Sequence, residues 1–228
     1  MIPAMITEPI QDALFDLDEL ARLAVTATPW TGRCPLGYTT DYYTPTELDA
    51  ALDRWRAQYG NFGCYPFSHM WHPDLCDQPL ILEAHQLHLY NADGRCDLHI
   101  YGVASPGRDQ ADHDHSANPL PGQLMTQANC PACRWHHIDP SERKVVEAWH
   151  DHAFPGWREL PVLPTKLARN RGEKKTNAKI LDWALAHYPT SFQINGAPII
   201  TERNSDATRA VAGRSPFGGY DLAHPTTE

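Results

Sequence analysis

Polar and apolar residues alternate from Leu80 to Tyr90 and again from Cys96 to Val103, which is the period of a half-buried β-strand. The residues between these stretches, Asn91-Ala92-Asp93-Gly94, have the composition of a tight turn. The pattern predicts a β-hairpin over residues 80–103. His85 falls among the alternating positions, so one face of the hairpin is expected to be polar and accessible.

Apolar residues recur at helical spacing in four other segments. The acidic N-terminal segment is expected to form a helix that packs or docks, because its apolar positions are Ile10, Leu14, Leu17, Leu20 and Leu23. A second helix is predicted from Thr46 to Tyr59, capped by Thr44 or Thr46. A third begins at Asp139-Pro140-Ser141 and continues from Glu142 to Trp149, and a fourth runs from Thr176 to Tyr188.

These elements predict an α+β fold with a small antiparallel sheet, few short helices and many loops. Twenty prolines and fourteen glycines favour the loop-rich character. The expected divisions are an acidic helix or binding peptide (1–28), an α+β core (29–104), a flexible loop (105–127), a zinc-knuckle and helix unit (128–165), and a basic arm with a helix and C-terminal extension (166–228).

The segment Cys130-Pro-Ala-Cys133 is the strongest chemical signal in the chain. A Cys-x-x-Cys turn places two sulfurs on one side of a tight knuckle, which suits a tetrahedral zinc ion. The remaining ligands are expected from the histidines that follow. His150 ranks first and His152 second, with His136 and His137 as alternates for the fourth position. Residues two apart face different sides of a helix, so His150 and His152 can share one ion only if the helix frays.

Other cysteines and histidines leave alternatives open. Cys64 and Cys76, with His69 and His72, could form a second knuckle. The loop Asp112-His113-Asp114-His115 is expected to be flexible and polar, although a histidine- and carboxylate-rich chain could also hold a catalytic metal. Against an enzyme, the sequence lacks the His-Glu-x-x-His, Gly-x-Ser-x-Gly, phosphate-loop and dinucleotide-binding patterns.

Charge is distributed unevenly along the chain. The formal net charge is -9, which disfavours a broad grip on duplex DNA. Positive residues nevertheless gather in one stretch, which predicts a short contact arm for nucleic acid or an acidic partner: Lys166, Arg169, Arg171, Lys174, Lys175 and Lys179. Neither an apolar run long enough to span a membrane nor a secretion signal is apparent, so a cytoplasmic protein is expected.

Near the N-terminus, Gln11-Asp12-Ala13-Leu14-Phe15 resembles the short peptide with which bacterial proteins bind the sliding clamp. The resemblance implies that Gln11 hydrogen-bonds the rim of a pocket while Leu14 and Phe15 fill an apolar groove. The same residues also belong to the apolar stripe of the predicted helix, so they could instead form part of the core.

The Cys130-Pro-Ala-Cys133 motif, with the run from Glu147 to Pro161, resembles the small zinc-motif proteins of actinobacteriophages and their hosts over residues 120–165. The resemblance brings no assigned activity with it, but the acidic composition, the zinc knuckle, the basic arm and the clamp-like peptide together indicate a non-enzymatic accessory protein of phage or mobile-element DNA metabolism with a structural zinc. Examples of such a role are a recombination directionality factor that binds a large serine integrase and a factor associated with the sliding clamp. The alternatives are a metal-dependent hydrolase built on the histidines and an inhibitor of a host protein.

Overall fold

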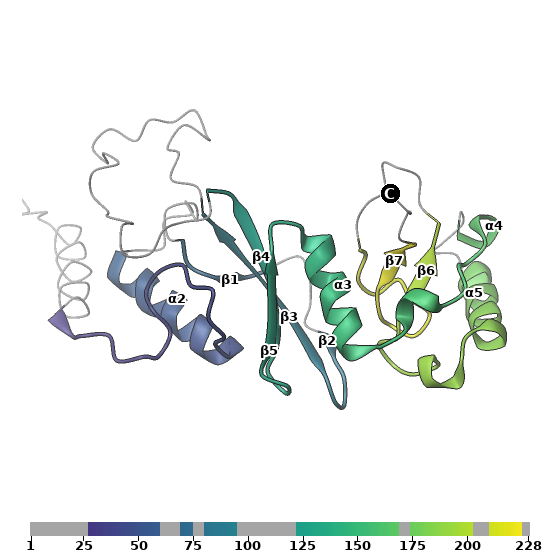
Figure 1. The fold of residues 1–228 in the computed structure, drawn as a ribbon, viewed down its shortest axis with the longest axis horizontal. Helices are drawn as coiled ribbons and strands as arrows, with labels where there is room; N and C mark the ends of the chain where they lie inside the picture. Colours follow the sequence, from purple (N-terminus) through teal and green to yellow (C-terminus); the bar gives the residue numbers. More distant parts are fainter. Residues whose placement is uncertain are drawn as a thin grey trace, which may run out of the picture.

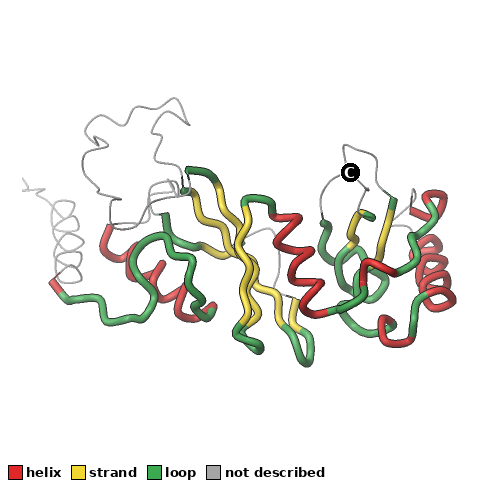
Figure 2. Tube along the Cα trace, in the orientation of Figure 1, coloured by secondary structure: helices red, strands yellow, loops and turns green. Residues whose placement is uncertain are grey.

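The protein was analysed as a computed structural model that describes residues 27–59, 69–74, 80–94, 122–168, 174–202 and 210–224. A small β-sheet lies near the middle of the structure, with helices on both sides of it (Figures 1 and 2). In chain order the elements are α2 (Pro45–Tyr59), β1 (His72–Pro73), β2 (Leu80–Ile81), β3 (Gln86–Asp93), β4 (Leu124–Cys130), β5 (Trp135–Asp139), α3 (Glu142–Ala153), η4 (Trp157–Glu159), α4 (Thr165–Ala168), α5 (Lys174–His187), η5 (Thr190–Phe192), β6 (Ile199–Thr201) and β7 (Asp221–Ala223).

Five of these strands form an antiparallel sheet in the order β1-β3-β4-β5, with β2 also paired to β3. The register between β3 and β4 sets His88 opposite Asn129 and Tyr90 opposite Gln127. The register between β4 and β5 sets Cys130 opposite Trp135. A separate pair, β6 and β7, is parallel. This architecture confirms the predicted α+β class with a small antiparallel sheet.

Each face of the five-stranded sheet has its own hydrophobic core, because successive strand residues point to opposite faces. Leu89 and Ala128 pack on the α3 side with Val145 and Trp149. The other face packs against α2, through a cluster of Leu48, Ala51, Leu52, Tyr90, Ala92 and Met125 with further residues. Figure 1 shows α2 and α3 on opposite sides of the sheet. The sheet is therefore the middle layer to which both helices attach.

The start of α2 has a capping box, in which side chain and backbone exchange hydrogen bonds. The backbone N–H of Thr44 donates to Glu47 Oε2 at 2.8 Å, and the N–H of Glu47 donates to Thr44 Oγ1 at 3.3 Å. Of the two residues predicted to cap this helix, the structure therefore uses Thr44. α3 begins near the predicted position and remains helical to Ala153.

The structure differs from the sequence analysis at the predicted turn. Asn91 to Asp93 form the end of β3 and pair with Thr126 to Leu124 of β4. The side chain of Asn91 is occupied within the sheet, since its Nδ2 donates to Asp74 Oδ2 and its Oδ1 accepts from Thr126 Oγ1. The predicted partner stretch, 96–103, lies outside the described residues, as does the predicted flexible loop up to residue 121. β2 and β3 form a shorter hairpin instead.

Beyond α3 the chain builds a second layer on the same core. Ile199, Ile200 and Leu222 of β6 and β7 are buried with Trp157 and with Ile180 of α5. The core is thus continuous from the α3 face of the sheet to α5. Among the described helices, none has both the length and the apolar character that crossing a membrane would require.

Candidate metal centre

His85 is positioned by the β2–β3 hairpin. Leu80 pairs with Leu87 and Ile81 with Gln86, and the N–H of Leu82 donates to the carbonyl of His85 at 2.9 Å. The backbone of Gln86, the next residue, forms two hydrogen bonds. Its N–H donates to Cys130 Sγ at 3.4 Å, and its carbonyl accepts from Trp149 Nε1 at 3.0 Å. These bonds place His85 beside the ends of β4 and α3.

The two cysteines lie on the turn that connects β4 to β5. Cys130 is the last residue of β4, and the N–H of Cys133 donates back to the carbonyl of Cys130 at 3.2 Å. Arg134 follows with a φ of 54°, a left-handed conformation that returns the chain to β5. The Cys130 side chain is fully buried, whereas Cys133 is exposed. The knuckle is thus the tip of a hairpin within the main sheet.

His152 lies in the last turn of α3. Its ring stacks on the indole of Trp135, with centroids 4.8 Å apart and an interplanar angle of 1°. It also meets the His85 ring edge-on, at 4.8 Å and 83°. Trp135 is opposite Cys130 in the sheet, so this stacking brings the helix end to the base of the knuckle.

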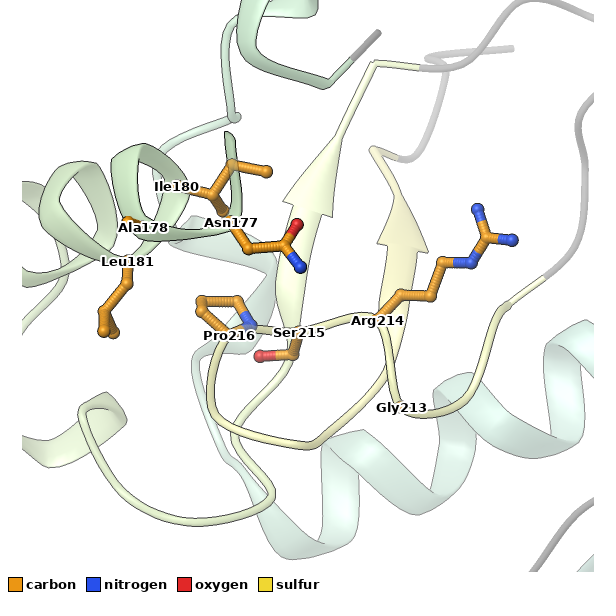
Figure 3. Close-up of a pocket in the computed structure, with 8 residues that line it drawn as sticks. All are labelled: Asn177, Ala178, Ile180, Leu181, Gly213, Arg214, Ser215 and Pro216. Carbon is orange, nitrogen blue, oxygen red and sulfur yellow. The ribbon is translucent and has the colours of Figure 1, made fainter. Parts of the chain in front are cut away.

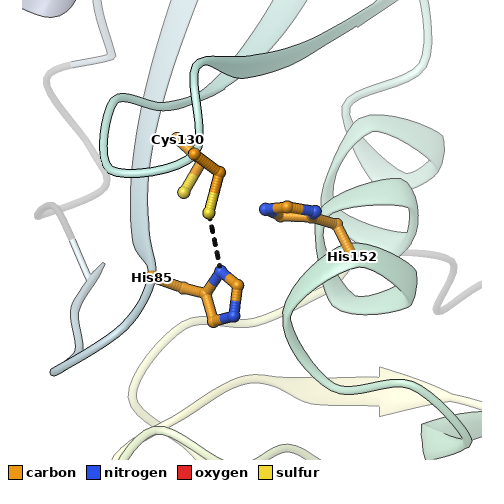
Figure 4. Close-up of side chains that lie close together, drawn as sticks. His85, Cys130 and His152 are labelled. Atoms are coloured by element: carbon orange, nitrogen blue, oxygen red, sulfur yellow. Dashed lines mark hydrogen bonds between the residues drawn. The ribbon is translucent and has the colours of Figure 1, made fainter.

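These three segments bring four metal-binding side chains together. One ligand atom from each of His85, Cys130, Cys133 and His152 lies within 4.8 Å of all the others. Cys133 Sγ and His85 Nδ1 are 3.4 Å apart. Ligand atoms around a tetrahedral zinc, with bonds of about 2.0–2.3 Å, are separated by about 3.3–3.8 Å. Figure 4 shows the rings of His85 and His152 pointing toward Cys130 from different elements.

The chemistry of the four side chains fits a bound cation. His152 Nε2 is buried and has no hydrogen-bond partner among the described residues, so a metal would satisfy it. Desolvation, together with the nearby His85, lowers the pKa of His152 and favours the neutral ring that binds metal. Desolvation and the neighbouring Cys130 sulfur raise the pKa of the Cys133 thiol. Two adjacent thiolates therefore need a positive charge between them.

His150, the first-ranked histidine in the sequence analysis, lies in the hydrophobic core instead of the cluster. Its Nδ1 is 2.8 Å from the carbonyl of Val146, and its ring contacts the rings of Trp149, Phe154, Trp157 and Tyr220. Because α3 is intact through Ala153, residues two apart differ in direction by about 200°. His150 therefore faces the core when His152 faces the knuckle. Burial lowers the pKa of His150 to about 4.

The two alternates also lie outside the four-residue cluster. His136 Nε2 is 3.0 Å from the carbonyl of Thr40, beyond the opposite face of the sheet. The ring of His137 stacks beside that of Trp135, two residues earlier in β5, with centroids 6.3 Å apart. The structure thus brings together Cys130, Cys133 and His152, as the sequence suggested, and adds His85. Local spacing did not point to His85, because it lies 45 residues before Cys130 in the sequence.

The predicted contact arm is described in part. Lys166 lies in α4, which packs near α5, and Lys175 and Lys179 are exposed one turn apart on α5. Arg169 and Arg171 fall outside the described residues, and Lys174 is the first residue of α5. Neither Lys175 nor Lys179 forms an ion pair within the described chain.

A cavity of about 560 Å³ lies between α5 and the loop 213–216. Figure 3 shows Asn177 and Ile180 of α5 on one side and Pro216 and Ser215 on the other, with the Arg214 side chain extending away from the helix. Leu181 also lines the cavity, and Leu185 follows one turn later with 47% of its surface exposed. This end of the molecule thus combines exposed leucines, a cavity and exposed lysines.

Other predicted sites remain without a structural description. The clamp-like residues Gln11, Leu14 and Phe15 lie outside the described part of the chain, as do Cys64, Cys76 and the loop from Asp112 to His115. His69 and His72 are described. The Nδ1 of His69 is 2.7 Å from the carbonyl of Asp93.

Residues 34–228 match a family model described as "Family of unknown function (DUF6349)", and the chain belongs to that family. No curated protein and no solved structure matches the chain.

Proposed function

We propose that this member of the DUF6349 family is a non-enzymatic binding protein in which a structural zinc ion joins the β2–β3 hairpin, the β4–β5 knuckle and the end of α3. The observation that carries the proposal is the convergence of His85, Cys130, Cys133 and His152 within 4.8 Å. The knuckle supplies two of the four ligands and the other two segments supply one each, so no single segment can complete the site.

Two sulfurs and two imidazole nitrogens are a donor set that suits zinc, whereas magnesium and calcium prefer oxygen ligands. Four protein ligands complete a tetrahedron. Catalytic zinc sites typically have three protein ligands and a position open to water, so this arrangement favours a structural ion over the metal-dependent hydrolase. Trp135 and Trp149 support the same reading, because they pack the ligands against the hydrophobic core.

The C-terminal layer offers a surface for a protein partner. Leu181, Leu185, Lys175 and Lys179 are exposed on one helix beside the cavity, which combines apolar area with positive charge. Such a surface suits an acidic partner with apolar side chains better than bare duplex, because the chain as a whole carries a net charge of -9.

We further propose that the partner belongs to phage or mobile-element DNA metabolism, such as a large serine integrase or a sliding clamp. This proposal is supported by the sequence: the Cys130-Pro-Ala-Cys133 motif with its flanking run, and the clamp-like peptide from Gln11 to Phe15. Binding of the full chain to a purified integrase and to a purified clamp tests it directly.

The zinc assignment is tested by measuring metal per chain in purified variants that form matched pairs. His85→Leu and His152→Leu should reduce bound zinc at least tenfold, because each removes one of four ligands. His136→Leu and His150→Leu are the controls, since these histidines lie outside the cluster, and both should retain one zinc per chain. A parent protein without zinc, or equal zinc in all four variants, would refute the structural site. A second, exchangeable metal would favour the hydrolase.

A further inference from the structure

The two sulfur ligands differ sharply in their access to solvent. Cys130 is fully buried at the end of β4, and its Sγ accepts a hydrogen bond from the Gln86 N–H at 3.4 Å. Cys133 lies on the exposed side of the turn, and its sulfur faces His85 Nδ1 at 3.4 Å and the carbonyl of Ala84 at 4.0 Å. Burial shields Cys130 from solvent, so a dissolved oxidant reaches Cys133 first.

We propose that Cys133 is an oxidation site, at which peroxide enters the metal centre, and that Cys130 resolves the oxidised sulfur as a disulfide with release of the zinc. This inference rests on the proposed zinc site. Its geometric basis is that the two sulfurs lie within 4.8 Å of each other, on a turn closed by the bond from Cys133 N–H to the Cys130 carbonyl.

The chemistry requires peroxide as the oxidant and proceeds in two steps. The Cys133 thiolate attacks one peroxide oxygen, the O–O bond breaks, and hydroxide leaves. The product is a sulfenic acid at Cys133, oxidised by two electrons. The Cys130 thiolate then attacks Cys133 Sγ, an S–S bond forms, the S–O bond breaks, and a second hydroxide leaves. The two hydroxides take up two protons from the buffer, so the net reaction converts two thiolates, one peroxide and two protons to one disulfide and two waters. A disulfide sulfur is a poor zinc ligand, so both thiolate ligands are lost together.

The structure indicates which contacts respond to the oxidation. His85 and His152 come from separate segments, and the proposed ion would join those segments at this point. Without the ion, His152 Nε2 is a buried nitrogen with no hydrogen-bond partner among the residues that the structure describes. Relief of that unsatisfied group requires His152 to leave the face of Trp135. Oxidation should therefore loosen the end of α3 and change the fluorescence of Trp135.

The test treats the zinc-loaded full chain with hydrogen peroxide and follows zinc release with a chromophoric chelator, alongside peptide mass analysis. The parent should release one zinc per chain in step with a Cys130–Cys133 disulfide, and thiol reduction with added zinc should restore the starting state. Cys34→Ala is the control. This buried cysteine lies outside the centre, and its pKa is raised to about 12 by burial, so release should be unchanged.

Two further variants separate the roles of the sulfurs. In Cys130→His the resolving thiol is absent, and a dimedone adduct should accumulate on Cys133. In Cys133→His the exposed thiol is absent, and adduct on Cys130 should be at least tenfold lower, even if the variant binds zinc weakly. Equal labelling of the two sulfurs would overturn the inference. So would a parent that keeps its zinc through peroxide treatment, although the zinc proposal would then stand. A parent isolated without zinc contradicts the proposed function itself.

Discussion

Removal of the metal should lower the thermal stability of the folded chain, because the four ligands join three segments around Trp135 and Trp149. A ligand that binds only the folded state stabilises it by about 2.7–4.1 kcal/mol at 100–1,000 times its Kd. The buried His152 Nε2, left unpaired, costs about 1–3 kcal/mol by itself, which is of the same order. For a chain of this size, each kcal/mol shifts the midpoint by about 2–4 °C, so a decrease of about 5–16 °C is expected.

The assay is thermal unfolding followed by tryptophan fluorescence, with and without a chelator, at constant protein concentration. The midpoint of the parent should fall on chelation and recover when zinc is added back. His152→Leu should have the lower midpoint from the start and should not respond to chelator. If chelation empties the site completely and moves the midpoint by less than about 1 °C, the ion does not hold the segments together, and the structural role is refuted.

Two other predictions concern residues outside the centre. Replacement of His150 by leucine should change the free energy of unfolding by less than about 1.5 kcal/mol. The variant loses one hydrogen bond, but it also removes a buried Nε2 that has no partner among the described residues. A loss above about 3 kcal/mol in chemical denaturation would contradict this balance. The full chain should bind a short DNA duplex weakly, with a Kd on the order of 10⁻⁴–10⁻⁶ M at physiological salt. In fluorescence anisotropy, Lys179→Glu should weaken this binding, whereas the charge-matched Lys144→Glu on α3 should leave it unchanged. Equal effects of the two substitutions would argue against a contact surface on α5.

Local sequence patterns predicted much of the fold, because their periodicity reflects interactions between near neighbours. The capping box of α2 and the apolar positions of α2 and α3 are of this kind. The run Val145, Val146, Trp149 and His150 forms the buried face of α3, so its helical phase already assigns His150 to the core. That phase also directs His152 to another side. Helical phase was therefore a better guide to the histidines than their proximity to the cysteines.

The remaining part of the site depends on pairing between distant strands. His85 reaches the knuckle only because β3 lies beside β4, and no spacing rule relates residues 45 positions apart. The composition of Asn91 to Gly94 favours a turn, yet Asn91 is satisfied by Asp74 and Thr126 within the sheet. In both places tertiary hydrogen bonds decide the structure, and a single sequence does not reveal them.

Two cysteines and two histidines from three segments are proposed to bind one zinc ion. X-ray absorption at the zinc edge of the purified full chain measures this coordination directly. The account predicts two sulfurs at about 2.3 Å and two nitrogens at about 2.0–2.1 Å from the ion. In His85→Leu the bound zinc, and with it the absorption signal, should fall at least tenfold, whereas the spectrum of His150→Leu should match that of the parent. A shell of oxygen ligands without sulfur in the parent, or an undiminished zinc signal in His85→Leu, would contradict this coordination.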